Sequence, residues 1–464
     1  MGFGAALRDL RALRWRHAIV ALALCQAALP TVFAQTVAPV WDLAQTIDHV
    51  ETANAGYAAA RAEYRAAQQA VPEAMAGLLP RVALSGKMQK GSTLVGESTG
   101  AKDFHTNGFT LSLTQPLINI GQWQTVDEAK LGEARDAISL AEAHQNVLAD
   151  ATSAYIDVLA AQARQRAAAA HRAALAEALE SARHAFQLGV VTVVEVDDAR
   201  ARLARSDADL AEFENDIEIA MSKLRKIAGD DSITVKPLPF AWTLRPVLPG
   251  ALSNLLERAE EENLGVARSR LETRIADKKI KEARSEFLPT VELVLSHSRG
   301  SATYLESQTN ILLGRAGHSD AIGIQISVPI FDGFSTLAKT RQRLDEKDSA
   351  DNKLVETIRA VRQQTRQAYL TLTSSLSRVH ALSEAIHAAV TARDAARKAY
   401  TLGVKINVDV LDAEDRLYAA QTDSIRATFD ALQSEIKLKW LTADLTEYYV
   451  AELNRAIYEG TNAP

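Results

Sequence analysis

The stretch "IQISVPIFDGF" at residues 324–334 joins two patterns that predict different kinds of structure. Its first five residues alternate between apolar and polar side chains, which is typical of a strand with one apolar face. Pro329 ends the alternation. From Ser335 to Leu402 the chain then contains neither proline nor glycine, the two residues that interrupt helices most strongly. The stretch therefore predicts a strand that leads into one long helix.

A second stretch, "LSLTQPLINIG" at residues 111–121, shows the same order of features. It is followed by residues 122–188, in which only Gly132 interrupts a helix-compatible sequence. Each helix would be about 100 Å long at about 1.5 Å per residue, far longer than the helices of ordinary globular proteins. We therefore expect an elongated protein rather than a compact enzyme.

Three further pairs of similar segments occur in the same order in the two halves of the chain. They are "GLLPRVALSG" (77–86) with "EFLPTVELVL" (286–295), "SAYIDVL" (153–159) with "QAYLTLT" (367–373), and "FQLGVVTVVEVDDARARL" (186–203) with "YTLGVKINVDVLDAEDRL" (400–417). A period above 200 residues excludes the short helical solenoids. We predict a duplicated unit of helix, strand, loop, strand, long helix, turn and helix. Its two copies are residues 35–227 and 263–464, and residues 228–262 form a linker rich in proline and apolar side chains.

The N-terminal residues predict a secretory signal peptide over residues 1–34. Four arginines precede the apolar run "AIVALALCQAAL", and small residues lead up to Gln35. The run is too short to span a bilayer, and no later segment has about 18 uncharged apolar residues. We expect the protein to leave the cytoplasm without a helical anchor. The only cysteine, Cys25, lies within the peptide. A lipid anchor on Cys25 is the alternative, but Leu24 precedes it where lipoprotein signals have a small residue.

Removal of the signal peptide makes the chain more acidic. The formal net charge changes from −6 to −9, because four arginines and one aspartate are lost. Nucleic-acid-binding proteins usually carry basic patches, so this charge argues against a nucleic-acid partner. No catalytic group of residues, phosphate-binding glycine loop or histidine pair at metal-ligand spacing is evident. We therefore predict no enzyme activity, no cofactor and no metal.

Four segments have one apolar and one polar face at a period of two. They begin near Val82, Phe109, Val291 and Ile322. An antiparallel sheet with one face on a soluble core has this pattern, and so do strands that cross a membrane. The exported chain favours the membrane alternative. Because four strands cannot close a barrel, that alternative requires several chains.

A heptad-type seam runs along the second long helix. Its members are Leu354, Ile358, Val361, Thr365, Ala368 and Leu372. Such spacing predicts that the helix packs lengthwise on neighbouring helices. A plain coiled coil would have the same seam, so the seam alone does not indicate a tunnel.

The chain resembles the TolC-like outer-membrane channel-tunnels of Gram-negative export systems. The resemblance rests on "VPIFDGF", "LTQPLINIG", the paired "LLP" and "FLP" segments and the paired Leu-Gly-Val turns, in one order behind a signal peptide. It implies a mainly α-helical chain with a small β part. Three chains would build a twelve-stranded outer-membrane β-barrel, four strands from each, continued by a long periplasmic α-helical barrel. Loops 90–106 and 299–319 would face the outside.

The resemblance also implies a function and partners. The homotrimer would be a passive exit duct that works with a periplasmic adaptor and an inner-membrane transporter, foremost an ABC exporter. The missing lipid anchor indicates the non-lipidated branch, which serves type I secretion of proteins such as toxins, or efflux of small molecules. A soluble periplasmic coiled-coil adaptor or scaffold is the alternative, but it would not need strands with a lipid-compatible face.

Two aspartates match the narrowest point of the family's tunnel. Asp409 and Asp412 would place six carboxylates around the aperture of a trimer and make it attractive to cations. Acids in the first turn of a helix are also favoured by the helix dipole, with Asn407 as N-cap, so a purely structural role is the alternative. Glu414 and Asp415 have no family counterpart, and we expect them to be solvated.

The resemblance assigns further roles near the same turn. Tyr400 and Glu195 match a hydrogen-bonded pair that holds the closed state. Lys405 matches the basic member of a second link, but Val194 stands where its hydroxyl partner is expected. Gly189 and Gly403 are the expected adaptor contacts at the helix tips. A helix end that needs a left-handed residue explains both glycines equally well.

Overall fold

A computed structural model of the chain describes residues 40–94, 101–239, 250–305 and 312–459. The predicted signal peptide therefore lies outside the described residues, and so do residues 240–249 of the predicted linker. The boundaries of the linker and of the two repeats stay predictions. The account below concerns these described residues, which belong to one unit of the chain.

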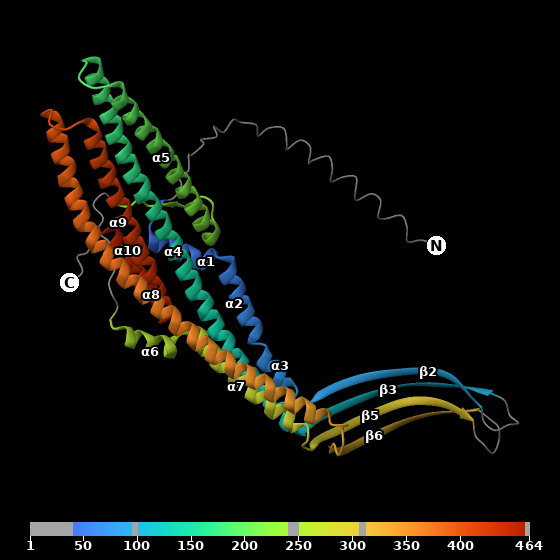
Figure 1. Ribbon diagram of the computed structural model, residues 1–464. Helices are drawn as coiled ribbons and strands as arrows, with labels where there is room; N and C mark the ends of the chain where they lie inside the picture. The colour runs from blue at the N-terminus through green and yellow to red at the C-terminus, as the bar shows by residue number, and fades with distance from the viewer. Residues whose placement is uncertain (1–39, 95–100, 240–249, 306–311, 460–464) are drawn as a thin grey trace, which may run out of the picture. The chain divides into compact units, whose positions relative to one another are not determined.

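The four predicted strands are present and form one antiparallel sheet. They are β2 (Arg81–Leu94), β3 (Ala101–Ile118), β5 (Thr290–Leu305) and β6 (Leu312–Ser327), in the order β2-β3-β5-β6 (Figure 1). The predicted loops 90–106 and 299–319 are too long, because pairing continues well into them. Thr106, for example, pairs with Gln89. The two strands of a hairpin satisfy each other's backbone N–H and C=O groups whatever their side chains are. The strands therefore continue beyond the point where the alternation of apolar and polar residues stops.

One face of the sheet is apolar across all four strands. Leu113 of β3 pairs with Leu295 of β5, which in turn pairs with Ile322 of β6. The side chain of Leu84 is 71% exposed and that of Ile322 is 75% exposed. A soluble sheet would bury this face in a core. In the described part of the chain the face stays open, which indicates that it is made for contact with another apolar phase.

The two long helices are also present. They are α4 (Ile120–Gln187), of 68 residues, and α8 (Ser335–Thr401), of 67 residues. Each ends in a short turn and is followed by a second helix, α5 (Val193–Ala228) or α9 (Asn407–Leu441). Helix α4 packs against α5 and α9, and α9 packs against α8 (Figure 1). Helix α7 (Leu264–Ser285) contacts both α4 and α8.

The predicted seam of α8 is confirmed. Val361, Thr365, Ala368 and Leu372 are buried, and Leu354 and Ile358 pack beside them. The apolar members of the seam share a cluster with Ala431 and Leu438 of α9. Their spacing brings one stripe of α8 against its neighbours over several turns. The long helices are therefore held by lengthwise packing.

The remaining elements are α1 (Leu43–Ala53), α2 (Ala55–Ala67), α3 (Ala70–Ala76), α6 (Leu252–Glu262), α10 (Glu447–Tyr458), β1 (Val40–Trp41) and β4 (Thr234–Val235). Helices α1 and α10 and strand β4 contribute to a second hydrophobic core, whereas α2 and α3 lie on α4 and α6 lies on α8. Strands β1 and β4 pair in parallel, and two residues are too few to show a period in the sequence. Fully buried Tyr155 of α4 lies in this core, where its hydroxyl is 2.5 Å from that of Tyr458.

No helix in the described ranges has both the length and the apolar character needed to cross a membrane.

The "VPIFDGF" segment converts strand into helix within seven residues. Strand β6 ends at Ser327, and Gly333 and Phe334 both have a left-handed φ of 67°. The Asp332 carboxylate accepts a hydrogen bond of 2.7 Å from the Thr336 amide in the first turn of α8. Phe331 and Phe334 are exposed and their rings meet edge to face at 5.4 Å. Exposed aromatic side chains at the end of a lipid-compatible sheet are typical of a membrane interface.

Candidate functional site

The turns after α4 and α8 have the same backbone geometry. Gly189 and Gly403 both have a φ of 72°. In the first turn the amide of Val190 donates to the carbonyl of Ala185 at 2.9 Å, and in the second the amide of Val404 donates to Ala399 at 2.9 Å. These bonds close the helix ends as Schellman motifs, which need a left-handed residue and therefore favour glycine.

Apolar side chains at both turns are exposed. Leu188 is 80% exposed and Leu402 is 78% exposed, although leucine usually lies inside a protein. Val190 and Val404 are exposed in the same way. Each chain therefore presents two small apolar tips, and the glycines lie within them.

Asp409 lies in the first turn of α9. Its carboxylate accepts a hydrogen bond of 3.4 Å from the backbone amide of Ile406, the residue that precedes the helix. Asn407 is the first residue of α9 and is buried, so the expectation that Asn407 is the N-cap is wrong. The position of Asp409 is compatible with both proposed roles, the aperture and the helix dipole.

Asp412 is paired with a cation of the same chain. Arg202 of α5 contacts it at 2.8 Å, Asp415 at 2.6 Å and Asp198 at 3.1 Å. Arg202 thus ties the start of α9 to α5. Although burial opposes its charge, the hydrogen bonds of Asp412 and the charge of the other two carboxylates raise the pKa of the Arg202 guanidinium. The negative charge of Asp412 is compensated, whereas no salt bridge in the described ranges involves Asp409.

Asp415 is held from a third helix as well. Nε2 of His171, on α4, lies 3.0 Å from its carboxylate, and the His171 ring stacks on Tyr418 at a centroid distance of 4.2 Å. The hydrogen bond from His171, which outweighs the opposing effect of burial, acts with Arg202 to lower the pKa of the Asp415 carboxyl. Asp415 is thus partly exposed but paired, whereas the sequence led us to expect a solvated charge without partners.

Glu414 is buried rather than solvated. Its side chain is only 6% exposed, and its carboxylate lies 2.7 Å from Arg397 and 4.0 Å from Arg393, both on α8. A buried carboxylate requires such a partner, because desolvation disfavours its charged form. The error arose because α9 packs between α4 and α8 and also touches α5, and the sequence alone does not show which helices become neighbours.

The residues of the proposed closed-state link, Tyr400, Glu195 and Lys405, do not contact one another through hydrogen bonds within the described part of one chain. Tyr400 packs against the buried cluster of Ala396, Val410 and Ala413. Glu195 lies in the first turn of α5, where one carboxylate oxygen is buried without a hydrogen-bond partner. In the part of the chain that the structure describes, no hydrogen bond joins Tyr400 to Glu195. Lys405 is exposed.

Sequence reasoning missed Arg202 and His171. Arg202 occupies the same repeat position as Arg416, since residues 186–203 match 400–417. The spacing from Asp198 to Arg202 predicts a pair within α5, but not the contacts with α9. His171 lies 244 residues from Asp415 in the chain, and no local pattern connects them.

Comparisons with known proteins agree on one kind of protein. The sequence model of the family described as "Outer membrane efflux protein" matches residues 48–230 and 255–443. Outer membrane protein TolC of Escherichia coli strain K12 is 25% identical over 424 residues, which cover 90% of this chain and 85% of that protein. Alkaline protease secretion protein AprF of Pseudomonas aeruginosa is 26% identical over 402 residues, covering 84% and 82%.

A solved structure shares the fold. The Campylobacter jejuni CmeC outer membrane channel superposes with a TM-score of 0.75 over 89% of each chain, at 15% sequence identity. At 15% sequence identity, the superposition shows that the two chains share a fold and says nothing about function.

Proposed function

The chain belongs to the outer membrane efflux protein family, and we propose that three copies of it form the exit duct of a tripartite export system. The observation that carries the proposal is the open apolar face of the sheet, directly continued by two helices of 68 and 67 residues. Strands of 14 to 18 residues exceed the roughly 9–11 that a tilted strand needs to cross a bilayer. The helices then extend about 100 Å into the periplasm.

Closure of the barrel requires other subunits. In the sheet of one chain, β2 and β6 are the edge strands. Unpaired strand edges are not tolerated in lipid, because their backbone groups lack partners there. Three sheets of four strands, joined edge to edge, give a closed barrel of twelve. The same threefold arrangement would bring three pairs of long helices into one hollow cylinder.

The duct itself is passive, and other proteins supply energy and select the cargo. We infer that a periplasmic adaptor docks at the exposed tips around Gly189 and Gly403, and that an inner-membrane transporter, foremost an ABC exporter, feeds the duct. Similarity to a relative named as an alkaline protease secretion protein favours type I secretion of protein. Efflux of small molecules is the second candidate, and the family's description favours it.

The aperture is proposed to lie at the starts of the α9 helices. Asp409 and Asp412 would form its acidic ring, with Asp409 supplying most of the potential because Asp412 is paired with Arg202. Tyr400, Glu195 and Lys405 are proposed to tie neighbouring helices together in the closed state. The buried, unpaired carboxylate oxygen of Glu195 supports this role, since such an atom is costly without a partner.

Conductance measurements test both the duct and its gate. The purified protein should form channels in planar bilayers that prefer potassium over chloride in a salt gradient. Asp409→Asn should lower that preference about twofold or more, because a ring of carboxylates focuses cations. Asp412→Asn is the matched control and should have the smaller effect. Absence of channels would contradict the duct. Channels with equal selectivity in all three proteins would contradict the gate alone.

A further inference from the structure

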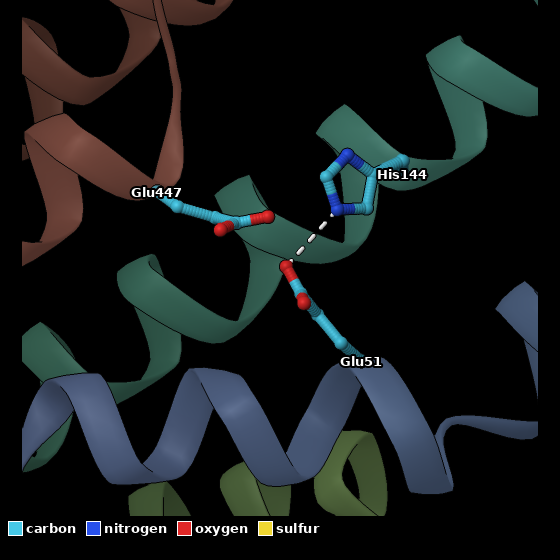
Figure 2. A group of neighbouring side chains, drawn as sticks. All are labelled: Glu51, His144 and Glu447. Carbon is cyan, nitrogen blue, oxygen red and sulfur yellow. Dashed lines mark hydrogen bonds and ion pairs between the residues drawn. The ribbon is translucent and has the colours of Figure 1, made fainter.

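A group of three ionisable side chains lies far from the turns. Glu51 of α1, His144 of α4 and Glu447 of α10 point toward one another from three helices (Figure 2). Nε2 of His144 is 3.0 Å from Oε1 of Glu51. One ligand atom from each of the three residues lies within 4.8 Å of the other two. We call this group the waist triad.

The backbone beneath the waist triad is well anchored. Val50 of α1, Leu148 of α4 and Val450 of α10 are buried in one hydrophobic cluster. Each lies within four residues of a member of the triad, so the three helices hold the side chains at a common edge of that core. The side chains of His144 and Glu51 are 30% and 23% exposed. The site is therefore open to solvent yet built on fixed elements.

The charges of the waist triad are not balanced by a basic residue. In the described ranges, neither Glu51 nor Glu447 forms a salt bridge with lysine or arginine. The nearby guanidinium of Arg61 contacts the backbone carbonyl of Glu51 and lies 4.7 Å from the centre of the Tyr57 ring instead. Two carboxylates this close repel each other unless a cation lies between them. An imidazole supplies that charge only when it is protonated.

We propose that the waist triad binds one divalent transition-metal ion, of which Zn²⁺ is the best match. One imidazole nitrogen and two carboxylates form a donor set that zinc accepts, and water completes the four positions. Two ligand atoms on a tetrahedral zinc ion are about 3.3 Å apart, close to the observed 3.0 Å between His144 and Glu51. The Glu447 carboxylate lies within 4.8 Å of the other two ligand atoms, so it must move closer by at most about 1.5 Å, which the rotatable bonds of its side chain allow.

The ion would connect three distant parts of the chain. Glu447 lies in the first turn of α10, directly after the N-cap Thr446. A bond from the metal to Glu447 fixes the start of α10 on α4, and the bond to Glu51 fixes the end of α1. Sequence reasoning predicted no metal because it searched for histidine pairs on one helix. The waist triad has a single histidine, and its members are separated by 93 and 303 residues.

Cobalt titration tests the proposal directly. The trimer is purified without an affinity tag, stripped with a chelator and titrated with Co²⁺, whose visible absorption reports coordination by the protein. One Co²⁺ should bind per chain, and Zn²⁺ should displace it. His144→Gln and Glu447→Gln should each weaken binding about tenfold or more, because each removes a ligand. Glu452→Gln changes an exposed acid on the same helix and should bind as the unaltered protein does.

Three results would overturn the proposal. Absence of saturable Co²⁺ binding is one, and equal binding by the Glu447→Gln and Glu452→Gln proteins is another. The third is a melting temperature that Zn²⁺ raises equally in the unaltered protein and both of these variants. In those cases the contact between His144 and Glu51 is a hydrogen bond within the protein and not part of a metal site.

Discussion

The turns after α4 and α8 share one backbone and differ in what surrounds them. Gly189 and Gly403 have the same φ and the same pattern of hydrogen bonds. After the second turn, however, the acids of α9 contact a histidine of α4 and arginines of α5 and α8. Arg202 forms three salt bridges, whereas its repeat counterpart Arg416 is exposed and forms none in the described ranges. The two turns share their backbone, and the asymmetry comes from packing between the two halves of the chain.

The positions of the helices explain the asymmetry. Helix α9 packs between α4 and α8, while α5 packs chiefly on α4. An acid on α9 therefore has cations within reach on more than one side. Ion pairs that join different helices near the second turn therefore converge on α9, the helix that also carries the proposed gate residue Asp409.

We expect substitution of Arg202 to cause the largest loss of stability at the two turns. Arg202→Gln leaves Asp198, Asp412 and Asp415 close together without the shared guanidinium. We expect a loss of about 2 kcal/mol per chain, because hydrogen bonds between charged groups contribute more than neutral ones and these groups are partly screened. Thermal unfolding gives the size of the effect, and hydrogen exchange locates it at the starts of α5 and α9.

Arg416→Gln is the matched control for Arg202→Gln. It removes the same charge from the corresponding position of the other repeat, where no salt bridge is lost. We expect the free energy of unfolding to change by less than about 0.5 kcal/mol, as for most surface substitutions. Equal losses in the two variants would show that net charge, rather than the bridge across α5 and α9, determines stability at the tip.

The elements of this fold were largely predictable from the sequence. A run without proline or glycine predicted α8, and a run interrupted only by Gly132 predicted α4, both almost to the residue, while alternation predicted the four long strands. Prediction failed where no period exists. Strands β1 and β4 have two residues each, and the outer parts of the hairpins pair through their backbones in segments whose sequence does not alternate between apolar and polar residues.

The site was predictable only in part. The left-handed glycines follow from local sequence, because a helix end has few ways to satisfy its carbonyl groups. Contacts such as Glu414 with Arg397, or His171 with Asp415, depend on which helices become neighbours. The acids of α9 look alike in the sequence, yet Glu414 is buried and Asp409 is not. Only packing separates them.

The shared backbone of the two turns predicts equal effects from equal substitutions. Gly189→Val and Gly403→Val each put a branched side chain at a φ of 72°, although no neighbouring atom lies within 4 Å of the added carbon. Each should therefore cost about 1–2 kcal/mol through backbone strain alone. Hydrogen exchange in the last turns of α4 and α8 measures the cost.

Gly132→Ala provides a contrast for these two substitutions. Gly132 lies inside α4 with open space around it, so alanine should stabilise the helix by about 0.5–1 kcal/mol. A much greater loss in the Gly403→Val protein than in the Gly189→Val protein would mean that the surroundings of the second turn, and not its backbone alone, require glycine.

The smallest expected difference is a pH effect that only the second repeat has. Asp415 corresponds to Ala201 in the first repeat, so only α9 carries a titrating group at this position. His171 and Arg202 lower the pKa of Asp415 below its ordinary 3.8. Its contribution to stability is therefore complete above about pH 4 and is lost as the pH falls through the lowered pKa. Melting temperatures between pH 5 and pH 3 should fall more for the unaltered protein than for Asp415→Asn.

The size of this pH effect should be below about 1 kcal/mol, because the Asp415 side chain is 43% exposed and water screens the pair. Other carboxylates titrate in the same range, so only the difference between the two proteins isolates Asp415. If the melting temperatures of the two proteins change with pH in parallel, His171 is held by its stacking on Tyr418 without help from the charge of Asp415. Converging curves at low pH would instead show that protonation of Asp415 releases α9 from both α4 and α5, since the same carboxylate binds His171 and Arg202.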